Sequence, residues 1–549
     1  MPIPDVANEA TTLPVDLLNA VQEAIKQRLV TRIWEKDTTV WSNDEQVCKT
    51  IADRLGWLTV PDWSLGRLSK IIDFADEVRK DGITSIVILG MGGSSLCVEV
   101  LRDTFEAKKG YPNLLVLDST HPDQVLAVER ACDLKKTLFI VASKSGTTLE
   151  PQCYYEYFWN KLEQYGSDRR LNFAAITDPG TPLEKMAIDL QFRGVFANPP
   201  DIGGRYSALS YFGMVPAALI GIDIEEVLSR ASSEAGLSKA EDERNASLIL
   251  GLFMGRAAKD GRDKLTIVTP PELHSFGYWA EQLIAESTGK LGRGILPVEG
   301  ESERARNEQR ERRIYTYFTI GEGALSDDER RDPIRLELHL ADQLGIGAQF
   351  FRWEFATAIA GSILGIDPFD EPNVAESKAK TNEVLAGYNG QHLKFPNVSG
   401  SIDNVDVIGQ PLAQNLSQTL NQFLSKSVRP EGYIAIMAYI ERNERSIAAL
   451  AELRDKLSLK YHVPVTVGFG PRFLHSTGQL HKGGQPTGTF IQLTDTPKED
   501  IPIPGKPYTF GSLIHAQAIG DFETLRKHDR PVIGFSLGND PLAAIAALA

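Results

Sequence analysis

Two polar loops contain the residue types that bind a phosphate group. Residues 90–95, Gly-Met-Gly-Gly-Ser-Ser, follow the apolar run 86–89, and residues 143–148, Ser-Lys-Ser-Gly-Thr-Thr, follow the apolar run 138–142. Each pattern predicts a buried strand that ends in a loop before a helix. Glycines let the backbone approach a ligand, N–H groups at a helix N-terminus point toward an anion, and the hydroxyls and Lys144 add donors. Two such loops can hold one phosphate, so they predict a phosphosugar site.

The first loop has two other interpretations. It is compatible with a plain strand-to-helix turn, or with a dinucleotide fingerprint in which Asp118 binds the ribose. Ser95 stands where the third glycine of G-x-G-x-x-G is needed. The dinucleotide interpretation also leaves the second, hydroxyl-rich loop without a role, so a phosphomonoester ligand is favoured.

Length and charge restrict the class of protein. A chain of 549 residues predicts two or three domains, and 42% hydrophobic residues is ordinary for a globular protein. The net charge of −15 argues against nucleic acid or an anionic membrane as a partner. An anionic substrate must therefore be attracted by local basic groups.

Cysteine spacing and apolar runs indicate the compartment. The four cysteines form no C-x-x-C pair and have no zinc spacing, which argues against a disulfide framework and a structural metal. Residues 1–16 lack a basic region followed by an apolar stretch, so a secretory signal is not predicted. Other apolar runs are too short to cross a bilayer. We expect a cytoplasmic enzyme.

Alternating strand and helix patterns predict an α/β protein with parallel sheets. Residues 13–80 are helical in pattern, and residues 397–407 have the composition of a linker. The domains expected are an N-terminal helical arm at 1–80, α/β domains at 81–227 and 228–396, and a C-terminal α/β domain at 397–549. The predicted strands are 85–89, 114–117, 138–143, 173–177 and 194–197, then 265–269, 314–320 and 334–340, then 433–438, 465–468, 489–493 and 532–537.

Further groups capable of chemistry lie outside the two loops. Arg205, after two glycines, is either a surface residue at a helix start or a fixed cation for developing negative charge. Gln282 and Glu286 are spaced to share one helix face, where Glu286 is either solvated or a catalytic base. Lys378 by itself is typical of an exposed lysine. The six-residue spacing of His475 and His481 argues against a paired metal site.

The order of these motifs resembles that of phosphoglucose isomerases. The two loops, Gly-Gly-Arg-Tyr-Ser, Glu-Ser-x-Gly-Lys around Glu286, and Pro-Phe-Asp-x-Pro-x-Val before Lys378 cover about residues 80 to 390. The resemblance implies two sugar-isomerase-type (SIS, flavodoxin-like) parallel-sheet domains, with the helical arm and the third α/β domain added. Residues beyond 395 resemble the tail of a bacterial branch that is often fused to transaldolase.

The resemblance also implies an activity and its residues. The activity is interconversion of glucose 6-phosphate and fructose 6-phosphate through an enediol, a step of glycolysis and gluconeogenesis, with no metal or redox cofactor. Glu286 would move a proton between C1 and C2, Arg205 would stabilise the enediolate, and Lys378 would assist ring opening. The phosphate and sugar would be bound by Gly93, Ser94, Ser143, Lys144, Ser145, Thr147, Thr148, Gly204 and Gln282.

One family residue, the ring-opening histidine between the catalytic glutamate and lysine, has no clear counterpart. His339 is the histidine in that interval, and its strand-like surroundings indicate a core or edge residue. His392, in a matching Gly-Gln-His tripeptide, follows Lys378 and is interpreted as accidental. The hypothesis is that the third domain supplies a substitute, His475 or His481, with His481 preferred. Two smaller departures are Thr288 for the usual Asn and Glu371 for the usual Gln.

Two other function classes are compatible with parts of the sequence. A non-catalytic phosphosugar-binding sensor would keep the loops without the base, and an NAD-dependent oxidoreductase would need the glycine that Ser95 replaces. The joint presence of Glu286, Arg205 and Lys378 favours the isomerase. The expected partner is a small sugar phosphate, and the resemblance implies a homodimer.

Overall fold

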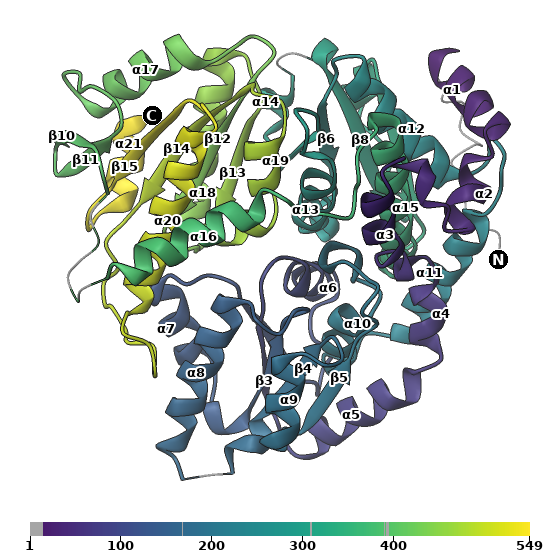
Figure 1. Cartoon of the computed structure of the whole chain (residues 1–549), viewed down its shortest axis with the longest axis horizontal. Coiled ribbons are helices and arrows are strands. Elements are labelled where there is room, and N and C mark those ends of the chain that lie inside the picture. Colours follow the sequence, from purple (N-terminus) through teal and green to yellow (C-terminus); the bar gives the residue numbers. More distant parts are fainter. Residues whose placement is uncertain (1–14, 167, 308–309, 389, 391–392, 394) are drawn as a thin grey trace.

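The computed structural model describes residues 15–166, 168–307, 310–388, 390, 393 and 395–549. His392 and the first residues of the predicted arm lie outside this part. Three sheets organise the chain, and Figure 1 shows them as three groups around a common centre. No helix of the described part has the length and apolar character needed to cross a membrane.

The first sheet is entirely parallel, with the order β2-β1-β3-β4-β5. Its strands were predicted from short apolar runs, and the burial of every residue of β1, β3 and β4 explains why those runs are continuous rather than alternating. The helices α6 (Leu96–Phe105) and α8 (Leu149–Glu163) follow β1 and β3. The strands are β1 (Ser85–Leu89), β2 (Asn113–Leu117), β3 (Thr137–Ala142), β4 (Phe173–Thr177) and β5 (Gly194–Ala197).

The second sheet is also parallel, with the order β7-β6-β8-β9. Its strand β7 was not predicted because it has four residues and contains a proline. The helix α15 (Ile346–Leu364) is mostly apolar, is buried along almost its whole length, and ends at Gly365, whose φ of 65° is left-handed. The strands are β6 (Lys264–Val268), β7 (Leu296–Glu299), β8 (Arg313–Ile320) and β9 (Arg335–Leu340).

The third sheet is mixed, with the order β10-β11-β15-β14-β12-β13. Its first two strands form an antiparallel hairpin, so the linker predicted at 397–407 is wrong. Asp403 and Asn404 have φ values of 51° and 64°, the left-handed geometry of a two-residue hairpin turn, and polar turn residues obscured the two short strands. The strands are β10 (Val398–Ile402), β11 (Val405–Ile408), β12 (Tyr433–Tyr439), β13 (Val465–Phe469), β14 (Gly488–Thr494) and β15 (Val532–Ser536).

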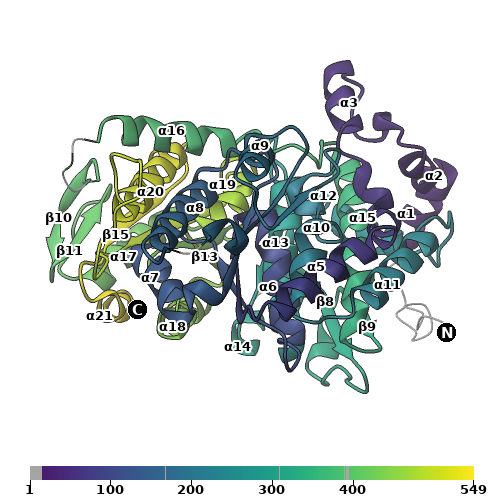
Figure 2. The same cartoon turned by 90° about the horizontal axis from the view of Figure 1, so that it is seen from below.

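Each sheet with the helices that cover it is called a unit here: the first contains β1–β5, the second β6–β9 and the third β10–β15, and helices join the three. The arm packs on the second unit: the Trp34 ring stacks on Phe351 and Phe355 of α15, and Trp41 Nε1 donates to the Ala358 carbonyl at 2.8 Å. In both views α16 (Val374–Ala386) runs along α20 (Phe510–Lys527) of the third unit (Figures 1 and 2). The arm helices are α1 (Val15–Lys26), α2 (Leu29–Trp34), α3 (Glu45–Ala52), α4 (Val60–Leu65) and α5 (Leu68–Lys80).

Candidate active site

The two predicted phosphate loops lie at the same edge of the first sheet. Strands β1 and β3 pair in parallel with Leu89 opposite Val141, so the loops that follow them leave side by side. In the first loop Gly92 has a φ of 55°, and a Cβ on Gly93 would stand 2.1 Å from the carbonyl oxygen of Gly204. Glycine is therefore required because this backbone touches the backbone beside Arg205.

Hydroxyl groups fill the second loop. The Ser143 hydroxyl donates to Thr148 Oγ1 at 3.0 Å, and the Thr147 hydroxyl donates to Ser145 Oγ at 3.0 Å. The Thr148 side chain caps no N–H group of the described α8, so the first turn of that helix keeps donors for an anion. Lys144 is less free than expected, because its ammonium pairs with Asp178 and donates to the Pro200 carbonyl at 3.1 Å.

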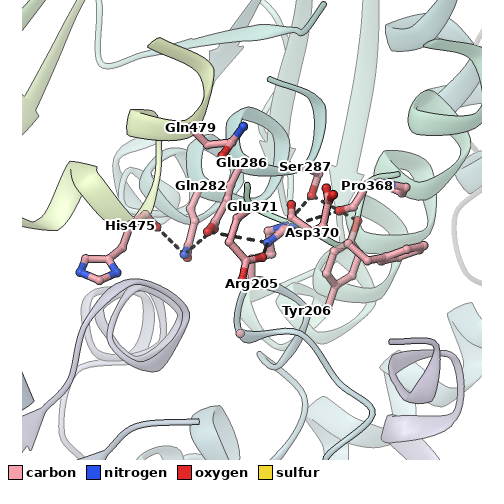
Figure 3. A network of polar contacts seen from close by, with 12 residues as sticks. Arg205, Tyr206, Gln282, Glu286, Ser287, Pro368, Asp370, Glu371, His475 and Gln479 are labelled. Carbon is pink, nitrogen blue, oxygen red and sulfur yellow. Dashed lines mark hydrogen bonds and ion pairs between the residues drawn. The ribbon is translucent and has the colours of Figure 1, made fainter. Parts of the chain in front are cut away.

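Arg205 is a buried cation, which excludes the surface interpretation. It lies in the 3₁₀ turn Gly204–Tyr206, and its side chain is 3% exposed. Its Nε donates to Ser287 Oγ at 2.8 Å, and Nη2 donates to the carbonyls of Pro368 and Asp370 at 2.8 and 2.9 Å (Figure 3). These neutral oxygens satisfy the N–H donors of the guanidinium without neutralising it, so Arg205 keeps its positive charge although it is buried.

Two carboxylates face this cation. Arg205 Nη1 is 3.7 Å from Glu286 Oε1 and donates to Glu371 Oε2 at 3.0 Å (Figure 3). Burial opposes the charge of Arg205, but Glu286 and Glu371 outweigh burial and raise its pKa. Burial raises the pKa of Glu286 above the ordinary value even though Arg205 opposes this. For Glu371 desolvation acts in the same direction, but the charge and hydrogen bond of Arg205, with the charges of Lys290 and Arg54, lower the pKa.

Helix α13 (Phe276–Thr288) places Glu286 and Gln282 on one face, as predicted from their spacing. Gln282 Nε2 donates to Glu286 Oε2 at 3.1 Å and to the carbonyl of His475 at 2.7 Å. A Cβ on Gly92 would lie 2.8 Å from the same Nε2. Figure 3 shows the Gln282 amide between Glu286 and His475, and the close approach of Gly92 adds the first of the two predicted loops to this meeting point.

His475 reaches the site from the third unit. It ends the 3₁₀ turn Arg472–His475, which follows β13, and its Nε2 is 3.2 Å from Glu150 Oε1. Burial alone would raise the pKa of Glu150, but His475 and Lys378 are among the groups that keep this pKa below its ordinary value. Lys378 itself is exposed on α16, and its charge reaches the buried Glu150. Glu150 is not among the predicted site residues, although a carboxylate two residues after the second predicted loop was the available signal.

His481 has surroundings unsuited to acid–base chemistry. Its ring lies among the rings of Tyr433, Phe473 and Phe490, and neither ring nitrogen has a hydrogen-bond partner among the described residues. Burial lowers the pKa of His481 well below its ordinary value, so the ring is neutral. The order of preference predicted from sequence is therefore reversed, because an apolar cage cannot be recognised from neighbours in the chain.

Other expected and unexpected residues can be placed. His339 is exposed on β9, where its Nδ1 is 3.0 Å from the Thr319 hydroxyl, in agreement with an edge residue. Gln479, which precedes His481, accepts from the Asn373 N–H at 2.8 Å and so holds the loop that carries Glu371. No cluster of three or more metal-ligating side chains occurs in the described ranges.

A family model described as phosphoglucose isomerase matches residues 68–294. This interval contains both loops, Arg205, Gln282 and Glu286. The chain is 24% identical over 384 residues to a probable glucose-6-phosphate isomerase of Methanococcus maripaludis, covering 62% of this chain and 86% of that protein. It is 28% identical over 397 residues to a glucose-6-phosphate isomerase of Caldanaerobacter subterraneus, and the match covers 61% of this chain and 87% of that protein. These matches support the resemblance to phosphoglucose isomerases.

Two solved structures share the fold. A hypothetical protein of Thermus thermophilus has a TM-score of 0.58 and 21% identity, covering 68% of this chain and 99% of that one. A glucose-6-phosphate isomerase of Chlamydia trachomatis has a TM-score of 0.51 and 19% identity, and the match covers 68% of this chain and 83% of that one. The mixed α/β fold with parallel sheets is thereby confirmed.

Proposed function

We propose that this chain interconverts D-glucose 6-phosphate and D-fructose 6-phosphate. The observation that carries the proposal is the buried pair of Glu286 and Arg205 beside the glycines of the first phosphate loop. The glucose-6-phosphate isomerases among its relatives, and the family model that spans both loops, support the same substrate. The third unit and the resemblance of residues beyond 395 support placing the chain in the branch often fused to transaldolase.

Phosphate binding fixes the sugar in the site. Hydroxyls of Ser94, Ser143, Ser145, Thr147 and Thr148, with the N–H groups at the start of α8, provide donors for phosphate oxygens at the edge of the first sheet. Lys144 adds positive charge beside them. Gln282 and Gly204 then line the sugar between this edge and α13.

Proton transfer follows from the arrangement of Glu286 and Arg205. In the aldose-to-ketose direction Glu286 removes the proton from C2 of the open-chain aldehyde. The resulting enediolate carries its negative charge on the C1 oxygen, and Arg205 stabilises this charge. The O2 proton then passes to O1, and Glu286 returns the carbon-bound proton to C1. The raised pKa of Glu286 matches a base that must hold this proton between the two steps.

Ring opening precedes this step and needs another acid–base group. His475, hydrogen-bonded to the buried Glu150, is the group in the described chain that we assign to it. The carboxylate is the hydrogen-bond partner that orients the imidazole, and Lys378 adds a second proton donor whose charge acts on the same carboxylate. Glu150 comes from the first unit and His475 from the third, while Lys378 lies on α16, which packs along α20.

The substitution Glu286→Gln tests the function. It removes basicity and keeps the shape, so turnover of fructose 6-phosphate should fall by about 10³- to 10⁴-fold while the Kd for substrate changes little. The matched control is Glu281→Gln on the same helix. Burial raises the pKa of Glu281 to about 8, so it is mostly protonated at neutral pH and its replacement should be mild.

A coupled assay in the presence of chelator measures the turnover. If Glu286→Gln retains isomerisation, the base assignment is wrong. If the native chain binds fructose 6-phosphate and never turns it over, the phosphosugar-binding sensor replaces the isomerase.

A further inference from the structure

A chain of buried hydrogen bonds continues behind the Glu150–His475 pair. Gln517 Nε2 donates to Glu150 Oε1 at 2.8 Å, and the Thr120 hydroxyl donates to Gln517 Oε1 at 2.7 Å. Glu150, Gln517 and Thr120 are 5%, 3% and 0% exposed. Thr120 follows β2 of the first unit, whereas Gln517 lies in the middle of α20 of the third unit.

The bonds fix the orientation of the Gln517 amide. An ionised Glu150 carboxylate only accepts hydrogen bonds, so the NH₂ group of Gln517 faces it, and the Thr120 hydroxyl holds the amide in this orientation by donating to its oxygen. The oxygen of Glu150 that accepts the bond from Gln517 also faces His475 Nε2. The amide therefore holds that oxygen in the direction of the histidine without adding a charge to the pair.

The charges around Glu150 explain why a neutral donor is useful here. His475 faces it from the turn after β13, Lys378 acts on it from α16, and Tyr154 lies on its own helix α8. A second cation at position 517 would compete with His475 for the carboxylate, and a hydrocarbon would leave a buried charge with one donor fewer. An amide stabilises the carboxylate and leaves its attraction for the histidine intact.

We propose that Gln517, oriented by Thr120, is a positioning residue for ring opening and holds Glu150 so that His475 can exchange protons with the sugar. This rests on the function proposed above. Helix α20 then has a role beyond covering the third sheet. Two side chains of the third unit, His475 and Gln517, enclose one carboxylate of the first.

Anomer exchange measures this step alone. In the Glu286→Gln background isomerisation is blocked, but ring opening still interconverts the α and β anomers of glucose 6-phosphate, which NMR exchange spectroscopy resolves. Adding Gln517→Met should slow the enzyme-catalysed exchange by about 10-fold or more, and Thr120→Val by about 3-fold. The Kd for the sugar phosphate should stay within about 2-fold because the phosphate loops are unchanged.

The matched control is Gln492→Met. Gln492 is a buried glutamine of β14 that donates to the Ala518 carbonyl of the same helix α20 at 3.0 Å. It should cost fold stability to a similar degree and leave anomer exchange unchanged.

The outcomes separate this proposal from the function itself. Equal exchange rates for Gln517→Met and its parent would overturn the role of Gln517 while leaving the isomerase intact, as would equal losses for Gln517→Met and Gln492→Met. Should Gln517→Met fail to fold, Thr120→Val decides, and an exchange rate equal to that of the parent refutes the proposal. Isomerisation retained in Glu286→Gln alone would instead refute the proposed function.

Discussion

The first and third units both present functional groups after the carboxyl ends of parallel strands, but they do so in different ways. The first unit uses backbone and hydroxyl groups in loops that leave β1 and β3 beside each other. The third uses one side chain, His475, in a turn after β13. The proposed phosphate binding therefore depends on local backbone geometry, whereas the proposed acid–base chemistry depends on how separate units pack.

Contacts of the His475 turn show this dependence. Arg472, at the start of the turn, pairs with Glu99 of α6, and Ser476, just after it, donates to Glu281 of α13 at 3.2 Å. The carbonyl of His475 accepts from Gln282. Each neighbour comes from another unit, so the histidine is placed by tertiary contacts. The difference between the two units can be tested by substitutions in each.

Among the substitutions that compare the two units, replacement of Arg205, the buried cation beside the first loop, should have the largest effect. Arg205→Met is expected to reduce kcat for fructose 6-phosphate by about 10³-fold, because the enediolate loses its stabilising charge. Steady-state kinetics with circular dichroism as a control for folding measure this. A loss confined to KM would show that Arg205 binds substrate instead of stabilising the enediolate.

Replacing His475 should separate ring opening from isomerisation. His475→Asn is expected to lower turnover of cyclic substrate by about 10²-fold. The exchange of the C2 proton of erythrose 4-phosphate with solvent should stay nearly unchanged. This aldose phosphate cannot form a five- or six-membered ring, so its reaction needs no ring opening. Equal losses in the two assays would mean that the third unit acts on the whole site and not on ring opening.

Glu371 should affect the pH dependence more than the rate. Its negative charge is one of the causes that raise the pKa of Glu286. Glu371→Gln removes that charge, so Glu286 should lose its proton at a lower pH, and the acid limb of kcat should move down by about 0.5–1 pH unit. A limb that moves up would contradict the assignment of Glu286 as the base. The measurement is kcat from pH 4 to 8.

Replacing His481 should have the smallest effect. His481→Phe places an apolar ring among aromatic rings, and no hydrogen bond with a described residue is lost. Turnover should stay within about 2-fold, and the free energy of unfolding should be equal or higher. A 10²-fold loss of turnover would restore the order of the two histidines predicted from sequence, so this variant is the direct counterpart of His475→Asn.

The predicted sheets and loops succeeded where the signal is local. Short apolar runs ending in glycine and hydroxyl residues located β1 and β3, and helical spacing placed Gln282 beside Glu286. Prediction failed at β7 and at the hairpin of β10 and β11, because a four-residue strand and a polar two-residue turn carry little local pattern. It also missed Glu150, whose role depends on partners more than 300 residues away along the chain.

Residue types and their spacing alone determined that this chain has parallel α/β architecture, paired loops rich in glycine and hydroxyl groups, and a candidate base with a candidate cation. These properties follow from hydrophobic periodicity and from the backbone freedom of glycine, which act over a few residues. Tertiary structure alone decided which histidine meets Glu150, that Arg205 is buried beside Glu286, and that α20 supplies Gln517. Burial and charge pairing depend on the packing of units that are distant in sequence, so local pattern carries no record of them.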